Sequence, residues 1–229
     1  MVMLVLQMGE RDEVGRAFAN RVEEEAEICC PKRGERPKRP LAEYAGIVVS
    51  GSSSMVTDRL SWSLDTAQML LPVVGQVPIL AVCYGHQMLS DSLGGEVDYL
   101  PIWQVGQTYM ELTEDAREDE LFSVFAQASQ VPVHLLHGQG VVRLAQNSVV
   151  LGKTLADAHH ALRLAKQCWT VQFHPEMTLA DMQAPTQRHE SLNRPVQALG
   201  DVGASADSPG RLLLRRFVEI CKRQQVSKL

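Results

Sequence analysis

The chain has 229 residues, of which 45% are hydrophobic and 21% are charged, so it can bury a core and is neither disordered nor collagen-like. Its 22 Lys and Arg residues against 27 Asp and Glu residues give a net charge of −5, which offers no overall positive field for a nucleic acid partner. No apolar stretch approaches the roughly 20 residues that span a bilayer, and the five cysteines form no Cys-x-x-Cys pair. We therefore expect a soluble protein of the reducing cytoplasm, without a membrane partner.

Apolar runs of strand length recur along the chain and alternate with segments of helical periodicity. Strands are expected at Met1–Leu6, Gly46–Ser50, Pro78–Val82, Val131–Leu136, Val149–Leu151 and Cys168–Phe173. Helices are expected at Asp12–Glu25, Trp62–Val74 and Arg211–Lys222. Wholly apolar strands followed by helices are typical of an open, mainly parallel sheet that helices cover on both faces. We predict such an α/β fold, with residues 1–229 forming a single domain.

Three other segments depart from this pattern. The Cys29–Pro40 segment combines Pro, Gly, Lys and Arg, which indicates an exposed loop. The Tyr99–Thr113 segment alternates apolar and polar residues, which predicts antiparallel strands added to the main sheet. The Leu179–Ser208 segment is rich in Gln, Ala, Pro, Ser and Asp, and we expect a loop there.

Cys83 lies where a predicted strand passes directly into a predicted helix, in the sequence Val77-Pro-Ile-Leu-Ala-Val-Cys-Tyr-Gly-His-Gln. Such a turn lifts one side chain above the carboxyl edge of the sheet, where sites in open α/β sheets form. The helix dipole and the free N–H groups lower the pKa of a thiol there, and the amide of Tyr84 is placed to receive an oxyanion. Cys83 is thus a candidate nucleophile, the alternative being a buried, inert cysteine.

A candidate base follows in the sequence Val171-Gln-Phe-His-Pro-Glu. Pro175 restricts His174 to an extended conformation, so its imidazole and the Glu176 carboxylate can project to the same side. His174 would accept the proton of the Cys83 thiol and return it to a leaving amine, while Glu176 would hold the imidazole tautomer. We predict that these three residues form a catalytic triad for acyl transfer.

Four sequence blocks in this order resemble those of the class I glutamine amidotransferases, the triad family whose glutaminase domains hydrolyse glutamine to glutamate and ammonia. The blocks are Ile47-Val-Val-Ser-Gly-Ser-Ser-Ser-Met-Val, Cys83-Tyr-Gly-His-Gln, Leu136-His-Gly-Gln and Gln172-Phe-His-Pro-Glu. They are most similar to the glutaminase domains of GMP synthases. The resemblance implies the flavodoxin-like fold of this family with a small antiparallel addition, and an enzyme without a cofactor.

The resemblance also implies roles for residues outside the triad. Backbone amides of Gly51, Ser52 and Tyr84 would form the oxyanion hole. The substrate-binding residues would be Gln87, His137, Gly138 and Gln139.

Positions 52, 53 and 139 depart from the family pattern. Ser52 and Ser53 stand where the family usually has Gly-Pro, so this loop must reach its geometry without a glycine's freedom. Gln139 stands where the family frequently has Asp. We expect weak activity from the isolated chain, rising when a partner reorders residues 50–56.

Three functions fit these residues: hydrolysis of glutamine through a Cys83 thioester, hydrolysis of another γ-glutamyl amide, or regulation by a module that binds glutamine with little turnover. The chain has neither a Ser-Gly-Gly-x-Asp-Ser phosphate loop nor a Gly-x-x-x-x-Gly-Lys-Ser/Thr loop. We therefore expect no synthetase or ATP-pyrophosphatase domain, and a separate synthetase subunit as ammonia acceptor. The histidines at 134, 137, 159 and 160 lack paired carboxylates at ligand spacing, so we expect no metal site.

Overall fold

The structure, a computed structural model, describes residues 1–10, 12–22, 24–178 and 208–226. The predicted loop at Leu179–Ser208 therefore lies outside the described residues, apart from Ser208. The described strands form a nine-stranded sheet in the order β2-β1-β3-β4-β9-β8-β7-β5-β6. No described helix is both long and apolar enough to cross a membrane.

The strands are β1 (Val2–Leu6), β2 (Glu25–Cys29), β3 (Ile47–Val49), β4 (Ile79–Val82), β5 (Glu96–Leu112), β6 (Gln130–Arg143), β7 (Val149–Lys153), β8 (Ala161–Ala165) and β9 (Cys168–Val171). The α-helices are α1 (Asp12–Val22), α2 (Ser61–Leu70), α3 (Tyr84–Ser92), α4 (Glu114–Glu118) and α6 (Pro209–Val226). The 3-10 turns are η1 (Pro31–Arg33), η2 (Leu41–Glu43), η3 (Val56–Asp58), η4 (Leu71–Val73) and η5 (Phe122–Phe125).

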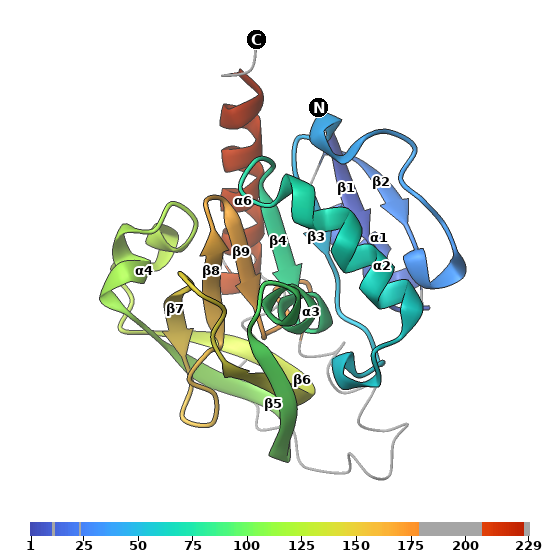
Figure 1. Cartoon of the computed structure of the whole chain (residues 1–229). Helices are drawn as coiled ribbons and strands as arrows, with labels where there is room; N and C mark the ends of the chain where they lie inside the picture. The colour runs from blue at the N-terminus through green and yellow to red at the C-terminus, as the bar shows by residue number, and fades with distance from the viewer. Residues whose placement is uncertain (11, 23, 179–207, 227–229) are drawn as a thin grey trace.

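The sheet has a parallel part and an antiparallel part. Strands β2, β1, β3, β4 and β9 are paired in parallel, and β8, β7, β5 and β6 continue the sheet in antiparallel pairing. Figure 1 shows the long β5 and β6 strands extending below the parallel strands. This architecture confirms the predicted α/β fold and its antiparallel addition.

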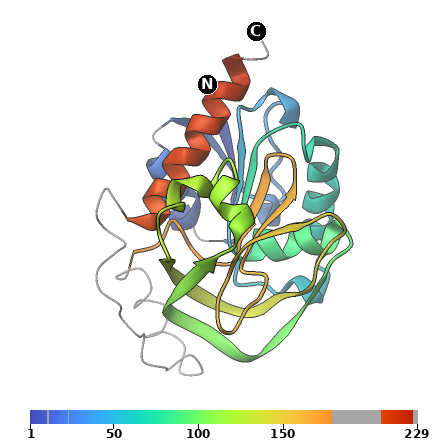
Figure 2. The ribbon, with the colours of Figure 1, turned by 90° about the vertical axis from the view of Figure 1, so that its left-hand side faces the viewer.

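Helices cover both faces of the parallel strands, with α2 and α3 on one face and α1 and α6 on the other (Figures 1 and 2). Successive residues of β1 point to opposite faces. Met3 packs in the cluster that contains Phe217 of α6, and Leu4 packs in the cluster that contains Leu89 of α3. Burial on both faces explains why these strands are apolar throughout.

The predicted helices differ from the observed ones mainly at their ends. The helix predicted at Asp12–Glu25 ends at Val22, and Glu25 begins β2. The helix predicted at Trp62–Val74 is α2 followed by η4, because Pro72 has no N–H to continue the α-helical hydrogen bonding.

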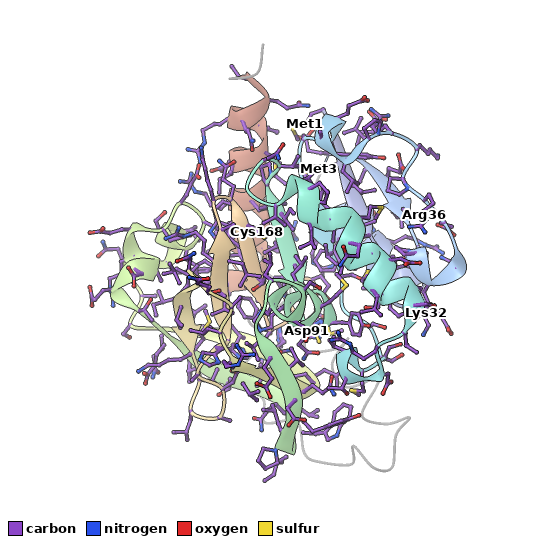
Figure 3. The ribbon with its side chains drawn as sticks, viewed as in Figure 1. Met1, Met3, Lys32, Arg36, Asp91 and Cys168 are labelled. Atoms are coloured by element: carbon purple, nitrogen blue, oxygen red, sulfur yellow. The ribbon has the colours of Figure 1, made fainter. Side chains whose placement is uncertain are left out.

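The Cys29–Pro40 segment contains η1 and runs beside α2. Figure 3 shows Lys32 and Arg36 on the side of the molecule where this segment lies beside α2. Arg36 lies 3.9 Å from the carboxylate of Asp65 on α2, and Lys32 lies 5.8 Å from the centroid of the Trp62 ring. The segment is thus an exposed loop along most of its length, with its start anchored to the domain.

Candidate active site

Cys83 occupies the sharp turn between β4 and α3, as the sequence predicts. Its backbone has φ 51° and ψ −103°, a conformation that residues with a Cβ rarely adopt and that is often found at functional sites. The N–H of Cys83 donates to the carbonyl of Val171 at 2.8 Å, which fixes the turn against β9. A Cβ at Gly85 would lie 2.8 Å from the carbonyl oxygen of Val49. Glycine at position 85 therefore allows α3 to begin close to β3.

His174 and Glu176 follow β9, the strand next to β4. Nδ1 of His174 lies 2.8 Å from Oε1 of Glu176, and both side chains are buried. An ionised carboxylate only accepts hydrogen bonds, so Nδ1 carries a hydrogen and Nε2 is the nitrogen left for the thiol. The N–H of His174 also donates to the carbonyl of His134 on β6 at 3.0 Å. These bonds fix the orientation of the imidazole.

The electrostatic surroundings suit His174 to accept a proton. Burial lowers its pKa, but the Glu176 carboxylate and the adjacent Cys83 outweigh burial and raise it well above its ordinary value. An imidazole with a raised pKa takes a thiol proton readily, and the carboxylate stabilises the imidazolium that forms.

Three other cysteines lie in surroundings that keep their thiols protonated. Burial raises the pKa of Cys29 to about 11 and that of Cys168 to about 12. Burial also raises the pKa of Cys221. Thiols that stay protonated in this way are poor nucleophiles.

Residues 50–56, called the Gly51 loop from here on, follow β3 and reach the same edge of the sheet. A Cβ at Gly51 would lie 3.0 Å from Cε1 of His174 and 3.9 Å from Sγ of Cys83. Oγ of Ser50 accepts a hydrogen bond from the N–H of Met8 at 3.0 Å and donates to the carbonyl of Gly51 at 3.0 Å. The backbone at Gly51 therefore adjoins both the candidate nucleophile and the candidate base. The oxyanion roles of Gly51, Ser52 and Tyr84 stay predictions.

The segment from Leu136 to Gln139 on β6 also borders the thiol. Sγ of Cys83 lies 3.8 Å from the carbonyl oxygen of Leu136. Gly138 is covered by the ring of Trp103 on β5, and a Cβ at position 138 would collide with it. Nδ1 of His137 donates to the carbonyl of Gln139 at 2.9 Å, and burial lowers the pKa of His137 to about 4. His137 is therefore neutral near pH 7.

Gln87 lies one turn after Cys83 on α3. Its Nε2 donates to the carbonyl oxygen of Gln139 at 2.7 Å and to Oε1 of Gln172 at 3.0 Å. Because a carbonyl only accepts, both bonds use hydrogens of the Gln87 amide nitrogen within the protein. The substrate-binding role of Gln87 stays a prediction. Gln172 is not among the site residues that the sequence predicts, although it begins the Gln172–Glu176 block.

The side chain of Gln139 is bonded to η3. It is 1% exposed, and both ends of its amide are bonded to η3. Its carbonyl oxygen, by contrast, accepts hydrogen bonds from Gln87 and His137. The predicted contact with substrate stays a prediction.

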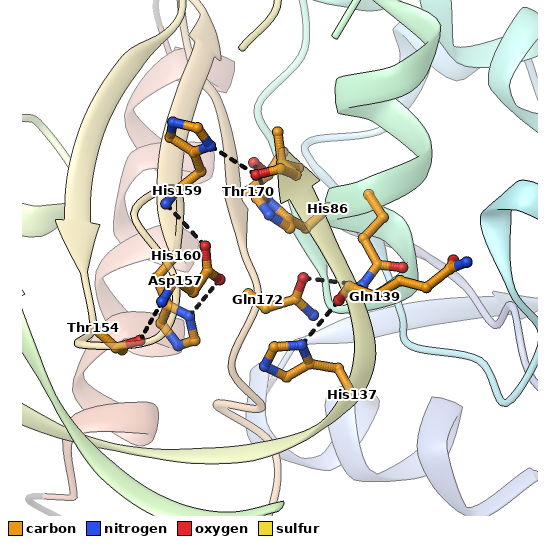
Figure 4. A network of polar contacts seen from close by, with 11 residues as sticks. His86, His137, Gln139, Thr154, Asp157, His159, His160, Thr170 and Gln172 are labelled. Atoms are coloured by element: carbon orange, nitrogen blue, oxygen red, sulfur yellow. Dashed lines mark hydrogen bonds and ion pairs between the residues drawn. The ribbon is translucent and has the colours of Figure 1, made fainter. Parts of the chain in front are cut away.

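A network of buried histidines adjoins these residues (Figure 4). Asp157 accepts hydrogen bonds from Nδ1 of His160 and from the N–H of His159, both at 2.9 Å. Burial opposes ionisation of Asp157, but the His160 hydrogen bond outweighs it and lowers the pKa of Asp157 to about 2. Nδ1 of His86 lies 2.8 Å from Oγ1 of Thr170. Within the described ranges, no group of three or more His, Cys, Asp or Glu side chains is arranged to hold a metal ion.

The chain is similar to known proteins in sequence and in fold. The family model described as "Glutamine amidotransferase class-I" matches residues 21–190. A GMP synthase [glutamine-hydrolyzing] from Porphyromonas gingivalis is 27% identical over 176 residues, which are 76% of this chain and 33% of that protein. The chain thus spans about a third of the length of this curated relative.

Two solved structures have the same fold over nearly their whole length. A glutamine amidotransferase from Thermotoga maritima has a TM-score of 0.80 at 19% identity, covering 96% of this chain and 97% of that one. A candidate GMP synthase subunit from Thermoplasma acidophilum has a TM-score of 0.70 at 16% identity, covering 100% of this chain and 98% of that one.

Proposed function

Since the chain belongs to the class-I glutamine amidotransferase family, we propose that it hydrolyses the side-chain amide of glutamine to glutamate and ammonia through a thioester on Cys83. The observation that supports this most is the convergence of Cys83, His174 and Gly51 at one edge of the sheet. The buried Glu176 carboxylate completes the set by holding the imidazole of His174.

The reaction has two steps. In the first, His174 takes the thiol proton, the sulfur of Cys83 bonds to the amide carbon, and the C–N bond breaks as His174 returns the proton to the leaving ammonia. In the second, His174 takes a proton from water, the hydroxyl oxygen bonds to the acyl carbon, and the C–S bond breaks to release glutamate as His174 returns the proton to the sulfur of Cys83. Backbone amides of Gly51, Ser52 and Tyr84 stabilise the oxyanion in both steps.

The amino-acid end of the substrate would lie against Gln87 and the His137–Gln139 segment. The inward direction of the Gln87 amide nitrogen presents Oε1 to the ligand, and an acceptor at this position suits the α-ammonium group of glutamine. The neutral imidazole of His137 adds no charge that would repel this group.

The ammonia would pass to a separate synthetase. We propose residues 1–229 as a single glutaminase domain, in keeping with the chain's resemblance to about a third of a GMP synthase and to a candidate GMP synthase subunit over nearly its whole length. The acceptor reaction would resemble that of the GMP synthases.

Ammonia and glutamate release from glutamine by the purified chain tests the proposal, with Cys83→Ala as the inactive variant. Cys30→Ala is the matched control, because Cys30 is also a buried cysteine but lies on the loop that follows β2. We expect equimolar products from the wild type and the control, and none from Cys83→Ala. Release from other γ-glutamyl amides but not from glutamine would identify the alternative substrate class. Binding of glutamine without turnover would identify a regulatory module.

A further inference from the structure

The side chain of Gln139 joins β6 to η3, although the two elements are more than 80 residues apart in the chain. Its Oε1 accepts a hydrogen bond from the N–H of Val56 at 3.0 Å, and its Nε2 donates to Oγ1 of Thr57 at 2.6 Å. Val56 ends the Gly51 loop and begins η3, so this one buried side chain holds the far end of the loop. We propose that Gln139 is a positioning residue that keeps the Gly51 loop in the conformation needed for oxyanion stabilisation, an inference that rests on the proposed function.

The loop needs such support because of its own sequence. Ser53 stands where the family usually has a proline, whose fixed φ would reduce the conformations available to the loop. The near end of the loop is held through Ser50, whose Oγ bonds to the N–H of Met8. The middle is held by Lys32, whose Nζ donates to Oγ of Ser54 at 3.2 Å. This middle contact is only partly buried, and water can compete for it.

The Gln139 contacts are shielded from such competition. Gln139 is 1% exposed and Val56 is 6% exposed, so breaking their hydrogen bond leaves buried polar groups without partners. The two bonds also use the donor and the acceptor of one amide, which fixes the direction of the side chain. An aspartate at position 139 is one methylene shorter, so its carboxylate would not reach both partners.

Gln139 is itself held by the elements that carry the triad. Its carbonyl oxygen accepts from Nε2 of Gln87 on α3, which begins directly after Cys83. Gln87 also bonds to Gln172, two residues before His174. The amides of Gln172, Gln87 and Gln139 therefore connect the base and the nucleophile to the Gly51 loop. The two departures from the family sequence, at positions 52–53 and 139, are thus structurally linked: the long amide at 139 compensates for the missing Gly-Pro.

The experiment compares Gln139→Leu with Thr57→Val, which removes one of the same bonds from the opposite side. Hydrogen–deuterium exchange of peptides covering residues 50–58 is measured first, because it reports on the loop without requiring activity. We expect exchange in both variants to be at least about tenfold faster than in the wild type. Thr113→Val is the control, since Thr113 caps α4 through the N–H of Ala116 and should leave exchange at residues 50–58 and kcat unchanged.

Steady-state glutamine hydrolysis is measured on the same proteins. Loss of one oxyanion donor costs roughly 10²- to 10³-fold in kcat in other hydrolases, and partial misplacement should lower kcat by at least about tenfold while KM stays within about twofold. Gln139→Glu should recover most of the rate, because its carboxylate can accept from both Val56 and the Thr57 hydroxyl. The double variant Gln139→Leu/Thr57→Val should be no worse than Gln139→Leu.

A raised KM with unchanged kcat and unchanged exchange would overturn the proposal and make Gln139 a substrate contact. If the wild type releases no ammonia, the proposed function fails instead. The exchange measurement then still decides by itself whether Gln139 holds the loop.

Discussion

Gly51 and His174 face each other across the carboxyl edge of the sheet, so closely that a Cβ at position 51 would lie 3.0 Å from Cε1 of His174. Gly51 follows β3, Cys83 follows β4 and His174 follows β9, and these strands are consecutive in the sheet. Because parallel strands end at the same edge, three segments that are distant in sequence meet there. The site is thus a direct consequence of the strand order.

The first prediction concerns this close approach. Gly51→Ala should lower kcat for glutamine by roughly tenfold to a hundredfold, because the added methyl group displaces the imidazole or the thiol from its reacting position. Gly51 does not have a positive φ, so alanine suits the backbone and the unfolding midpoint in urea should change little. If Gly51→Ala has the kcat of the wild type, glutamine hydrolysis does not require the open space beside His174.

The second prediction concerns the nucleophile. A glutamine analogue that carries an electrophile should label Cys83 before Cys29, Cys168 or Cys221, since burial raises the pKa of these three thiols and a protonated thiol reacts slowly. Peptide mapping after partial labelling identifies the modified residue. Prior incubation with glutamine should slow the labelling, and first modification of another cysteine would refute the assignment.

The third prediction concerns the Glu176 carboxylate, which raises the pKa of His174. This negative charge favours the imidazolium form, so the wild type should keep a protonated His174 to higher pH than a free histidine does. Glu176→Gln removes the charge and lowers the pKa of His174. Because His174 must be unprotonated to take the thiol proton, the acid limb of the kcat/KM profile should move to lower pH. Its loss of activity should be smaller than that of His174→Ala, since a base remains. NMR titration of the imidazole measures the pKa directly, and an unchanged value in Glu176→Gln would contradict the role given to Glu176.

The fourth prediction concerns the buried pair of Asp157 and His160. Asp157→Asn should lower the free energy of unfolding at pH 7 by about 2 kcal/mol, because the buried Asp157 carboxylate accepts hydrogen bonds from His160 and His159. The pKa of Asp157 is lowered to about 2 in the folded protein, against about 3.9 for an unfolded chain. Its stabilising contribution is therefore complete above about pH 4 and is lost as the pH falls towards 2.

Urea unfolding of the wild type and Asp157→Asn at pH 7 and at pH 3 tests whether the contribution of Asp157 to the free energy of unfolding falls with pH. The difference between the two proteins should be smaller at pH 3. An equal or larger difference at pH 3 would mean that Asp157 is not ionised in the folded protein.

The amino-acid sequence alone was sufficient to predict the features that depend on residues close together in the chain. The apolar runs that form β1, β3, β4 and β9 are buried on both faces of the sheet, and their composition reflects this directly. The turn at Cys83 was predictable because strand and helix meet there without a loop. The pairing of His174 with Glu176 was equally accessible, since two residues separated by one proline have few relative orientations.

Features that depend on distant partners were decided only by the tertiary structure. Strand β2 contains two glutamates and β8 contains an arginine, so neither has a continuous apolar run, and each was recognisable only from the strand it pairs with. The hydrogen bonds of the Gln139 side-chain amide to η3 are a further feature of this kind. A hydrogen bond between segments so far apart leaves no local periodicity in the sequence, because it forms only when the sheet brings β6 beside the Gly51 loop.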